Sequence, residues 1–305
     1  MKRDLISFAL WSAGDVTEIL NLSHRLKQGE RDSYTPLSRK SAALIFERKS
    51  LRTRVSFEVG IAQLGGHPIV LQQDAIGIAT RESVHDIGQV LSLYNEIIIA
   101  RTTRHQTCVQ LAESASVPVI NAMTDLVHPC QILADILTLQ ELRRFTPDAK
   151  LVYIGDGNNI ANSWLEIAEK LPIRLTLCCP AGYEPHPQIL EQSQRAGVST
   201  IESIQDPFEA AKHADVLYTD VWPRKDGGAD DARREQVFRP YQVNRQLLKE
   251  ASPGCVVMHR LPARRGEEIT SEVLDGEHAV ALQQAENRLH VQKGIMGFLL
   301  NPPAD

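Results

Sequence analysis

The sequence predicts an α/β protein built from two doubly wound parallel-sheet domains of similar size. Short apolar runs, typical of buried strands, alternate along the whole chain with longer segments of helical period. This alternation is typical of right-handed βαβ units, in which helices cover both faces of a parallel sheet. The length of 305 residues also suits two domains of ordinary size. Ligands of open parallel sheets bind beyond the carboxyl ends of the strands, so we expect an active site in the cleft between the domains.

Eight strands are expected, four in each domain. The strands of the first domain cover residues 41–46, 67–72, 96–101 and 117–122, and those of the second cover 150–155, 174–179, 215–219 and 255–260. Helices are expected between the strands, over residues 52–64, 83–94, 106–115, 131–144, 161–171, 187–196 and 206–213. The stretch 223–235 (P-R-K-D-G-G-A-D-D-A-R-R-E) is polar and contains glycine, which predicts a mobile loop.

The boundary between the domains is expected after residue 146. The helix that ends in Q-E-L-R-R-F is followed by Thr146-Pro147-Asp148, and a proline after a cationic last turn ends a helix. We therefore assign residues 1–146 to the first domain and 147–285 to the second. The closing segment 286–301 has helical period and no strand after it, so we expect it to pack back on the first domain.

Composition places the chain among globular proteins and gives no sign of a nucleic-acid or membrane partner. It has 43% hydrophobic and 23% charged residues and a net charge of -5. No run approaches the roughly 18 apolar residues of a membrane span. Trp11, Gly14 and Asp15 interrupt the N-terminal apolar stretch before a signal-peptide core forms. The five cysteines are odd in number and lack C-x-x-C spacing, which favours a reducing cytoplasm.

A cluster of cations, E-R-K-S-L-R-T-R at residues 47–54, follows the apolar run 42–46. The hydroxyl of Ser50 is expected to cap the following helix, while Arg52, Thr53 and the free backbone N–H groups bind a phosphate. The alternative is a solvated first turn with an ordinary serine cap. Cations in a first turn oppose the helix dipole, so an anion that they share with the dipole explains them better.

Two further groups of polar residues belong to the same sheet edge. Arg101 ends one strand, and D-L-V-H-P-C-Q-I-L-A-D at 125–135 follows another. Pro129 suits the first turn of a helix, which places His128 at the mouth of that helix and Gln131 just inside it. A single histidine there is more often structural than catalytic. Three strand ends nevertheless bring a phosphate cradle, a guanidinium, an imidazole and a carboxamide to one edge of one sheet.

The second domain offers a polar turn, G-D-G-N-N-I-A-N-S at 155–163. A dinucleotide site is the rival interpretation, but the G-x-G-x-x-G spacing is absent because Asn158 and Asn159 follow Gly157 with no third glycine. A turn that holds a small ligand fits better. The segments Asp220-Val221-Trp222 and His259 to Pro262 end two further strands, as expected for a site that faces the first domain. Taken singly, each segment is also explained as a structural loop, but their position at successive strand ends favours the cleft.

Together these motifs resemble the aspartate and ornithine carbamoyltransferase superfamily, and its ornithine branch most closely. The resemblance spans nearly the whole chain. It rests on F-E-R-K-S-L-R-T-R-V-S-F-E, Q-L-G-G-H, H-P-C-Q-I-L-A-D, G-D-G-N-N-I-A-N-S, Y-T-D-V-W, L-P-A-R-R-G-E-E and A-E-N-R-L-H, in this order. The implied activity is transfer of a carbamoyl group from carbamoyl phosphate to the amine of an amino acid, with L-ornithine giving L-citrulline in arginine metabolism.

The resemblance also implies the residues of the site. Those that bind carbamoyl phosphate would be Ser50, Leu51, Arg52, Thr53, Arg101, His128, Gln131, Leu261 and Arg288, with Arg81 from a neighbouring subunit. Those that bind the amino acid would be Asn159, Asp220, Arg224, Lys225, Arg260 and Leu261. Family members are trimers or multiples of trimers with sites at subunit interfaces. The segment 72–82 matches a loop that a neighbouring subunit contributes, and it carries Arg81 where many relatives have lysine.

The chemistry needs no cofactor, because phosphate is already a good leaving group. The protein must hold a neutral amine against the carbonyl carbon and stabilise the developing oxyanion. The catalytic candidates are Arg52, Thr53, Arg101, His128 and Arg260. Of these, Arg101, Thr53 and His128 are assigned to the oxyanion and Arg52 to the departing phosphate. Gln131 and the Leu261 carbonyl are assigned to the carbamoyl nitrogen. No histidine or cysteine spacing suggests a metal site.

Two departures from the ornithine branch concern the acceptor. That branch typically has S-M-G after D-V-W-x, where this chain has Arg224, Lys225 and Asp226, and it has H-C-L-P where this chain has Arg260. An inward Arg260 disfavours a cationic acceptor by about a few kcal/mol, because arginine stays protonated. Three readings follow, in order: ornithine with Arg260 facing solvent or paired with an acid such as Asp220; a different and more acidic amine; and a regulatory or structural relative without turnover.

Overall fold

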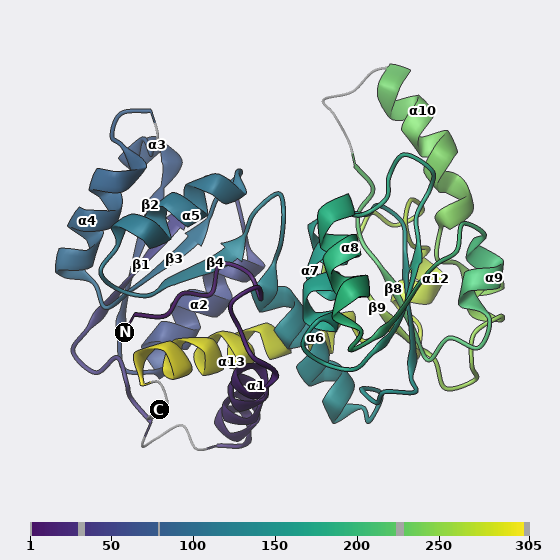
Figure 1. Cartoon of the computed structure of the whole chain (residues 1–305), viewed down its shortest axis with the longest axis horizontal. Coiled ribbons are helices and arrows are strands. Elements are labelled where there is room, and N and C mark those ends of the chain that lie inside the picture. The colour runs from purple at the N-terminus through teal and green to yellow at the C-terminus, as the bar shows by residue number, and fades with distance from the viewer. Residues whose placement is uncertain (1, 30–33, 79, 224–228, 302–305) are drawn as a thin grey trace. The chain divides into compact units, whose positions relative to one another are not determined.

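The computed structural model describes residues 2–29, 34–78, 80–223 and 229–301, which form two compact α/β units (Figure 1). Unit 1 comprises Met1–Leu137 and Glu286–Asp305, and unit 2 comprises Thr138–Ala285. Each unit contains one parallel sheet with helices between its strands, so the predicted α/β class with two parallel-sheet domains is confirmed. The boundary after residue 146 and the position of the active site in a cleft stay predictions.

The sheet of unit 1 has four parallel strands in the order β2-β1-β3-β4. Its central strand β1 (Ser41–Phe46) is buried at five of six positions and carries the apolar run of the sequence prediction. Phe46 pairs with Arg101 in the register of β1 and β3, so both strands end at the same edge. The remaining strands are β2 (His67–Gln72), β3 (Ile97–Arg101) and β4 (Val119–Met123).

The helices of unit 1 are α1 (Ala13–Gln28), α2 (Arg52–Gln63), α3 (Gln73–Ile76), α4 (Val84–Tyr94), α5 (His105–Ser114) and the first part of α6 (Pro129–Glu141). Of these, α2, α4, α5 and α6 begin and end within about three residues of the predicted limits, whereas α1 and α3 were not predicted. Helix α13 (Ala281–Leu300) belongs to unit 1 from Glu286 onward.

Helix α1 was not predicted, although the sequence carries its signals. Ser12 accepts a hydrogen bond from the Asp15 backbone N–H, and the Asp15 side chain accepts one from the Ser12 N–H, which completes a capping box. Gly29 ends the helix in the left-handed conformation, with φ of 118°. The buried positions Val16, Ile19 and Leu20 show helical spacing, so this segment was readable as a helix.

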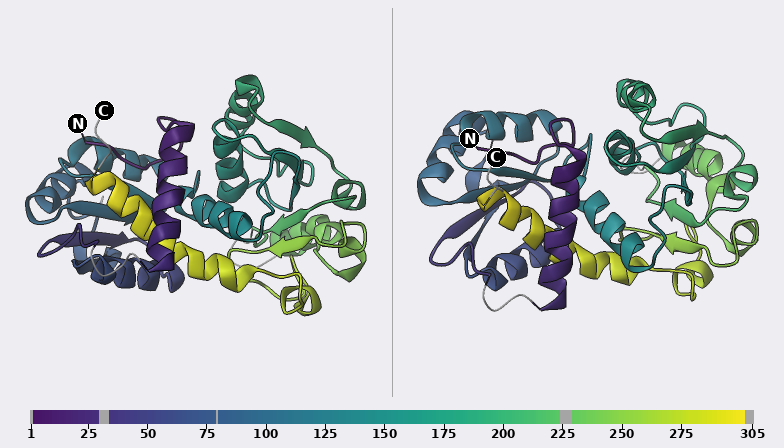
Figure 2. Two further views of the ribbon diagram at one scale, coloured as in Figure 1. Left: turned by 90° about the horizontal axis from the view of Figure 1, so that it is seen from below. Right: turned by 60° about the horizontal axis from the view of Figure 1, so that its bottom comes forward.

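Helix α13 packs against elements from the other end of the chain (Figure 2). The ring centroids of Phe298 and Trp11 lie 5.5 Å apart. Lys293 Nζ donates to Gln63 Oε1 of α2 at 2.9 Å. A Cβ atom added to Gly294 would lie 2.9 Å from the Ile19 carbonyl oxygen, which shows how closely α13 crosses α1. Only glycine allows this approach, and it fixes the position of the helix that carries Arg288.

The sheet of unit 2 has five parallel strands in the order β7-β6-β5-β8-β9, whereas the sequence predicted four. The missed strand, β7 (Thr200–Ser203), is short, lies at the sheet edge and is largely exposed, so it has no apolar run to mark it. The other strands are β5 (Lys150–Ile154), β6 (Arg174–Cys178), β8 (Val216–Thr219) and β9 (Val256–Met258). The helices are α7 (Asn159–Ala168), α8 (Pro187–Ala196), α9 (Pro207–Ala211), α10 (Ala229–Phe238), α11 (Arg245–Leu248) and α12 (Ser271–Leu274), with a 3-10 turn at Arg239–Tyr241.

The prediction of a loop over 223–235 is wrong in its second half. Residues from Ala229 onward form α10, and residues 224–228 lie outside the described part of the chain. Phe238, at the end of α10, contacts Tyr183 edge to face at 4.7 Å and Trp222 at 5.7 Å between ring centroids. This aromatic anchor is formed by residues distant in sequence, so the local polar composition does not reveal it.

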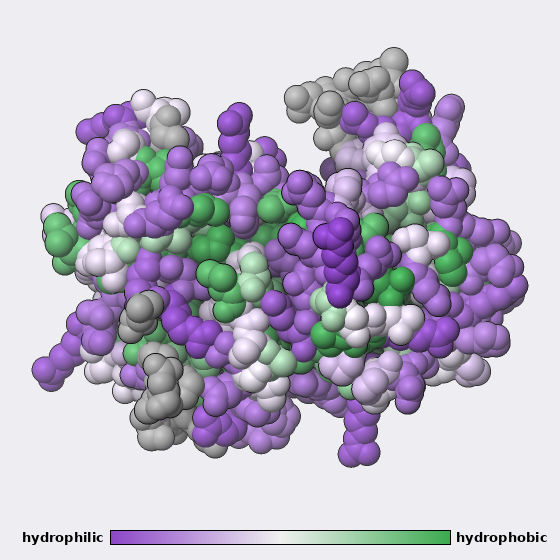
Figure 3. Space-filling model, viewed as in Figure 1, coloured by the Kyte–Doolittle hydropathy of each residue, from purple (hydrophilic) through white to green (hydrophobic). Residues whose placement is uncertain are grey.

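The surface carries mainly hydrophilic side chains, with hydrophobic ones scattered among them on the face shown in Figure 3. Within the described ranges, no helix is both long and apolar enough to pass through a lipid bilayer. All five cysteines are buried and free.

Candidate active site

The hydroxyl of Thr53 is the centre of the polar network in unit 1. Thr53 is buried in the first turn of α2. Arg101 Nη1 donates to Thr53 Oγ1 at 3.1 Å, and Arg288 Nη2 donates to the same oxygen at 2.6 Å. A hydroxyl has two acceptor positions and one donor, so both acceptor positions are occupied and the Thr53 proton is left to donate. The end of β3, the start of α2 and helix α13 therefore meet at one atom.

The network continues through α6. Arg288 Nη1 donates to Gln131 Oε1 at 2.9 Å, and Gln131 Nε2 donates to Asp135 Oδ1 at 2.8 Å. All three side chains are buried. The two bonds fix the Gln131 amide with its oxygen toward Arg288, and that oxygen keeps a second acceptor position. Asp135, which the sequence analysis did not select, lies four residues after Gln131, on the same face of α6.

His128 is fully buried and lies directly before α6, as the sequence predicted. The strand end that leads to it is held by polar contacts. The Met123 backbone has φ of 145°, a value that residues other than glycine rarely adopt. Its N–H donates to Asn121 Oδ1 at 2.9 Å, and Asn121 Nδ2 donates to the Ile6 carbonyl at 2.8 Å. Unusual backbone held by several bonds is common at functional sites.

The predicted cap by Ser50 is wrong. Helix α2 begins at Arg52, so Leu51 occupies the N-cap position and no side chain caps the helix. Ser50 stands one residue too early to do so. The first turn therefore has neither a side-chain acceptor nor an acidic residue, while Arg52 adds a positive charge. An uncapped N-terminus presents backbone N–H groups and the positive end of the helix dipole, which suits an anion.

A pocket of about 580 Å³ lies beside this loop. Its lining includes Ser50 and Leu51 together with Arg48, Lys49 and Arg54, and also Gln72, Gln73 and Asp74. Arg81, the residue expected to act in a neighbouring subunit, is exposed on the turn after α3. The structure therefore places Arg81 at the surface of unit 1 and outside the Thr53 network.

Unit 2 carries a second polar cluster, centred on Asp220. Asp220 follows β8 and is buried. Arg260, which follows β9, donates from Nε to Asp220 Oδ2 at 2.9 Å and forms an ion pair through Nη2 at 2.8 Å. Asn158 Nδ2 donates to the same oxygen at 2.9 Å. The ion pair between Arg260 and Asp220, one of the two arrangements that the first reading of the sequence allows, is present. The sequence analysis did not select Asn158 as a site residue. Its position next to Asn159, which was selected, is the signal that could have identified it.

Leu261 is held in an unusual backbone conformation next to Arg260. Its φ is 56°, in the left-handed region that favours glycine. The Leu261 N–H donates to His259 Nδ1 at 2.9 Å. Because Nδ1 accepts, Nε2 carries the ring proton and donates to Glu268 Oε1 at 3.0 Å. His259 and Glu268 are both fully buried, so this pair fixes the Leu261 backbone.

Asn159 is buried at the start of α7, after the turn 155–158. The Asn158 side chain caps this helix by accepting from the Ile160 N–H at 2.8 Å. Tyr153 Oη, on β5, donates to the Asp156 carbonyl at 2.8 Å and so fixes the turn. Burial, and next the charge of Asp220, raise the pKa of the Asp156 carboxyl from 3.8 to about 7. The charge of Asp220 therefore reaches the Asp156 carboxyl in this cluster.

The remaining predicted acceptor residues, Arg224 and Lys225, lie outside the described part of the chain. The described residues contain no group of three or more histidine, cysteine, aspartate or glutamate side chains that could hold a metal ion.

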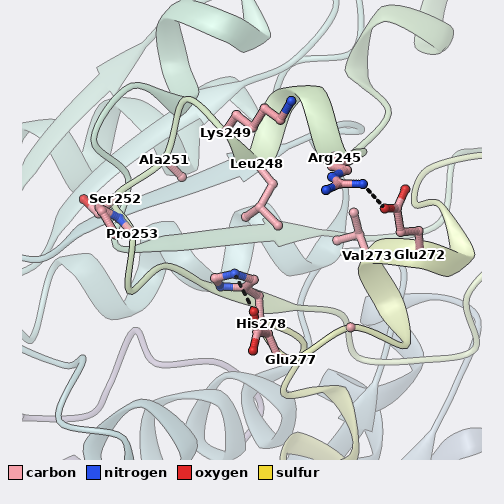
Figure 4. A pocket seen from close by; sticks show the side chains of 11 residues that line it. Arg245, Leu248, Lys249, Ala251, Ser252, Pro253, Glu272, Val273, Glu277 and His278 are labelled. Carbon is pink, nitrogen blue, oxygen red and sulfur yellow. Dashed lines mark hydrogen bonds and ion pairs between the residues drawn. The ribbon is translucent and has the colours of Figure 1, made fainter.

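Another pocket of unit 2, of about 600 Å³, lies away from these residues (Figure 4). Its lining comes from α11, α12 and the turn before β9, so it lies at the amino end of that strand, whereas Arg260 follows the carboxyl end. Arg245 and Glu272 on its rim pair at 3.1 Å and are largely exposed. An exposed ion pair of this kind forms no buried, oriented donor set, so we assign no chemistry to this pocket.

Two sequence models of one protein family match the parts of the chain that contain the two polar clusters. The sequence model of the aspartate/ornithine carbamoyltransferase carbamoyl-P binding domain matches residues 3–141. The model of the Asp/Orn binding domain of the same family matches residues 147–299. The first model covers the Thr53 network up to Gln131, and the second covers the Asp220 cluster and Arg288.

Individual relatives extend over nearly the whole chain. An ornithine carbamoyltransferase of Chlorobaculum tepidum is 47% identical in an alignment of 305 positions, which covers 98% of this chain and 90% of that protein. The solved structure of ornithine carbamoyltransferase from Pyrococcus furiosus superposes with a TM-score of 0.93 at 40% identity, covering 100% of this chain and 98% of the other. A solved N-acetyl-L-ornithine transcarbamylase gives a TM-score of 0.87 at 29% identity, covering 97% and 99%.

The two-domain α/β fold and the matches with known proteins together identify a transferase, and its class is that of the carbamoyltransferases. The chain belongs to the aspartate/ornithine carbamoyltransferase family. The resemblance stated from the sequence motifs, with the ornithine branch closest, is confirmed.

Proposed function

We propose that this protein transfers the carbamoyl group from carbamoyl phosphate to the side-chain amine of L-ornithine and forms L-citrulline and phosphate, in arginine metabolism. The observation that carries the proposal is the Thr53 network, in which two guanidinium groups converge on one buried hydroxyl beside an uncapped helix. Such a group of fixed donors suits an acyl phosphate, whose oxygens carry negative charge. The identity of 47% to an ornithine carbamoyltransferase supports ornithine as the acceptor.

The proposed roles in unit 1 follow the positions of the donors. The backbone N–H groups of the α2 first turn, with Ser50, Leu51, Arg52 and Thr53, bind the phosphate. Arg101, the Thr53 hydroxyl and His128 stabilise the carbonyl oxygen as it becomes an oxyanion. Gln131 accepts from the carbamoyl nitrogen through the free position of its oxygen. Arg288 keeps Thr53 and Gln131 in place through one hydrogen bond to each and adds positive charge.

The reaction is an acyl transfer between these groups. The neutral amine attacks the carbonyl carbon, the bond from that carbon to the phosphate oxygen breaks, and the amine proton passes to the leaving phosphate. No cofactor is required for this exchange. Holding the two reactants in line supplies much of the rate enhancement, and the fixed donors supply the rest.

The proposed acceptor residues lie in unit 2. Asn159 and Asp220 bind the amino acid, the Leu261 carbonyl accepts from the carbamoyl nitrogen, and Arg260 sets the charge at Asp220. Arg224 and Lys225 are proposed to contact the amino-acid carboxylate. A more acidic amine is the runner-up acceptor, because three cations replace uncharged residues of the ornithine branch. Pairing of Arg260 with Asp220 weakens that case, since the ion pair already neutralises one of the cations.

A homotrimer, or a multiple of trimers, is the proposed assembly. Two helices of unit 1 carry exposed apolar side chains on one face each. On α2 these are Val55 and Val59, preceded by the N-cap residue Leu51, and on α4 they are Val90, Leu93 and Tyr94. Apolar side chains gathered on exposed helix faces are typical of an interface between subunits. In such an assembly Arg81 would reach the phosphate of a neighbouring subunit. The proposed location is the cytoplasm.

A substrate panel tests the proposal. Purified protein is mixed with carbamoyl phosphate and with ornithine, N-acetylornithine, putrescine, lysine or aspartate, and phosphate release and product mass are recorded. We expect citrulline from ornithine, at a rate well above that of the other amines. Turnover of another amine with ornithine at background level would favour the runner-up acceptor. Binding of carbamoyl phosphate without turnover of any amine would favour a regulatory relative.

A further inference from the structure

The carboxylate of Asp220 is engaged at only one of its two oxygens. Oδ2 accepts from Arg260 Nε and from Asn158 Nδ2, both at 2.9 Å, and Arg260 Nη2 lies 2.8 Å away. Oδ1 is buried and has no hydrogen-bond partner among the described residues. A buried carboxylate oxygen without a donor is costly, so Oδ1 is suited to accept from an N–H group of a ligand.

The position of this oxygen is set by three strand ends. Asp220 follows β8, Arg260 follows the neighbouring parallel strand β9, and Asn158 lies in the turn after β5, the strand on the other side of β8. The carboxyl ends of these strands lie at one edge of the sheet, where ligands of parallel sheets bind. The Arg260 side chain is 11% exposed and that of Asp220 is 1% exposed, so water screens their charges little.

Geometry makes Arg260 a close neighbour of any ligand on Oδ1. A nitrogen that donates to Oδ1 lies about 5 Å from the guanidinium on Oδ2, because hydrogen bonds are about 2.9 Å long. Arginine stays protonated at any pH of interest. A second positive charge at this distance is disfavoured, whereas an uncharged amine is not. An uncharged amine that donates one N–H to Oδ1 also keeps its lone pair for attack on a carbonyl carbon.

We infer that Arg260 is a specificity-determining residue of the acceptor half-site, where it occupies Oδ2 of Asp220 and makes Oδ1 select an amine in its uncharged form. The inference rests on the proposed function and deepens it. Arg260 thereby lowers the affinity for protonated acceptors and raises the share of bound acceptor that is ready to react. The ion pair with Asp220 partly neutralises the charge of Arg260, so an arginine at this position is compatible with an amine substrate.

Other ionisable groups lie near Arg260 and Asp220, and the test must account for their titration. Tyr153 and Tyr218 lie close enough to Arg260 to influence it, and Cys179 lies near Tyr153. Burial raises the pKa values of Tyr153 and of Cys179, so both stay protonated in the assay range. Arg234 opposes the increase in the pKa of Asp156, which remains at about 7. Asp156 therefore titrates within the assay range, and each variant is also measured with Asp156→Asn.

The test is the pH dependence of kcat at saturating substrates, which reports groups in the enzyme–substrate complex. Arg260→Lys keeps the charge, Arg260→Gln keeps a donor for Oδ2 without charge, and Arg260→Met removes both. We expect the pH midpoint of the rising limb to increase by about one unit in the Gln and Met variants, and to stay near the wild-type value in the Lys variant. Equal midpoints in all four proteins would overturn the inference.

A binding measurement gives a readout without turnover. Norvaline, which lacks the side-chain amine, and ornithine trimethylated on its side-chain nitrogen are titrated calorimetrically in the presence of carbamoyl phosphate. In Arg260→Gln we expect the Kd of trimethylated ornithine, divided by the Kd of norvaline, to fall at least fivefold. An unchanged ratio would also overturn the inference. Absence of product from every amine with the wild-type protein would instead count against the proposed function, which keeps the two failures apart.

Discussion

The two polar clusters, one in each unit, handle charge in opposite ways. In unit 1, guanidinium groups from two elements converge on a single uncharged hydroxyl, and the helix beside them lacks both a cap and an acidic residue in its first turn. In unit 2, the carboxylate of Asp220 is already paired with Arg260. The cluster in unit 1 thus keeps an excess of positive donors for an anion, while the charges of Asp220 and Arg260 in unit 2 balance each other before any ligand binds.

The comparison shows how one family can keep its donor substrate and vary its acceptor. The unit 1 donors are tied together by bonds among α2, β3, α6 and α13, so a change in any one disturbs the others. The unit 2 cluster is formed by three loops at strand ends, where single residues can be exchanged without disturbing the sheet. Variation such as Arg260 is therefore expected in unit 2.

The largest effect is expected from Arg101→Met. It removes a fixed donor to the oxyanion and to Thr53, so kcat should fall about 10²- to 10³-fold in the ornithine assay. Arg104→Met, at an exposed position three residues later, is the matched control and should leave kcat within about twofold. If Arg101→Met keeps the wild-type kcat, the assignment of the unit 1 cluster to catalysis is contradicted.

Thr53→Val tests the bridging hydroxyl. Valine has the same shape but leaves the guanidinium groups of Arg101 and Arg288 without their shared acceptor, so kcat/KM for carbamoyl phosphate should fall about 10- to 100-fold. Thr53→Ser keeps the hydroxyl and should retain most of the activity. If valine and serine behave alike, the hydroxyl is a packing group only.

Gly157→Ala disturbs unit 2 alone. A Cβ atom at this position would lie 2.7 Å from the Glu184 carbonyl oxygen and closer still to the neighbouring backbone, which cannot give way. The turn that carries Asn158 must shift, so kcat/KM for ornithine should fall about 10- to 100-fold, while the Kd for carbamoyl phosphate stays the same. Gly14→Ala, whose added Cβ would meet only Ser12 Oγ at 3.6 Å, is the control. Equal loss of affinity for both substrates would contradict separate half-sites.

The smallest effect concerns stability. The pKa of Asp156 is about 7 in the folded protein against 3.8 ordinarily, so the folded state binds the extra proton. Stability should therefore decrease as pH rises from about 4 to 7, by about 1 to 4 kcal/mol. Asp156→Asn should remove this decrease, seen as a smaller drop in Tm between pH 5 and pH 8.

Asp15 of unit 1 provides the contrast for that measurement. A hydrogen bond from Arg3 holds the pKa of Asp15 below its ordinary value, so its contribution is present above about pH 4 and is lost as pH falls. Asp15→Asn should therefore lower Tm at pH 8. A Tm difference of the same sign for both variants at pH 8 would show that the two carboxyl groups are misassigned.

Much of the fold was predictable, because buried parallel strands are continuous apolar runs. Strand β1 matches its predicted range, whereas β7 has no such run and was missed. Helix α1 was missed despite its capping box. The loop over 223–235 was wrong because Phe238 anchors α10 on Trp222 and Tyr183, and such distant contacts leave no local signal.

The site was predictable where consecutive residues carry it. Thr53 and Arg101 were selected from strand-end position alone, but the Ser50 cap failed because the helix begins one residue later than capping requires. Arg288 lies 235 residues from Thr53, so only the family resemblance pointed to it. Asp135 and Asn158 were missed because each acts through a neighbour, and only the folded chain shows which oxygen or nitrogen they hold.

Calorimetric titration with carbamoyl phosphate, without any amine, tests the central claim most directly. We expect the wild-type protein to bind it with measurable heat and inorganic phosphate more weakly, and Thr53→Val to weaken the binding of carbamoyl phosphate at least tenfold. Equal affinity in the two proteins, or no heat in either, would contradict the assignment of unit 1 as the receptor for the acyl phosphate.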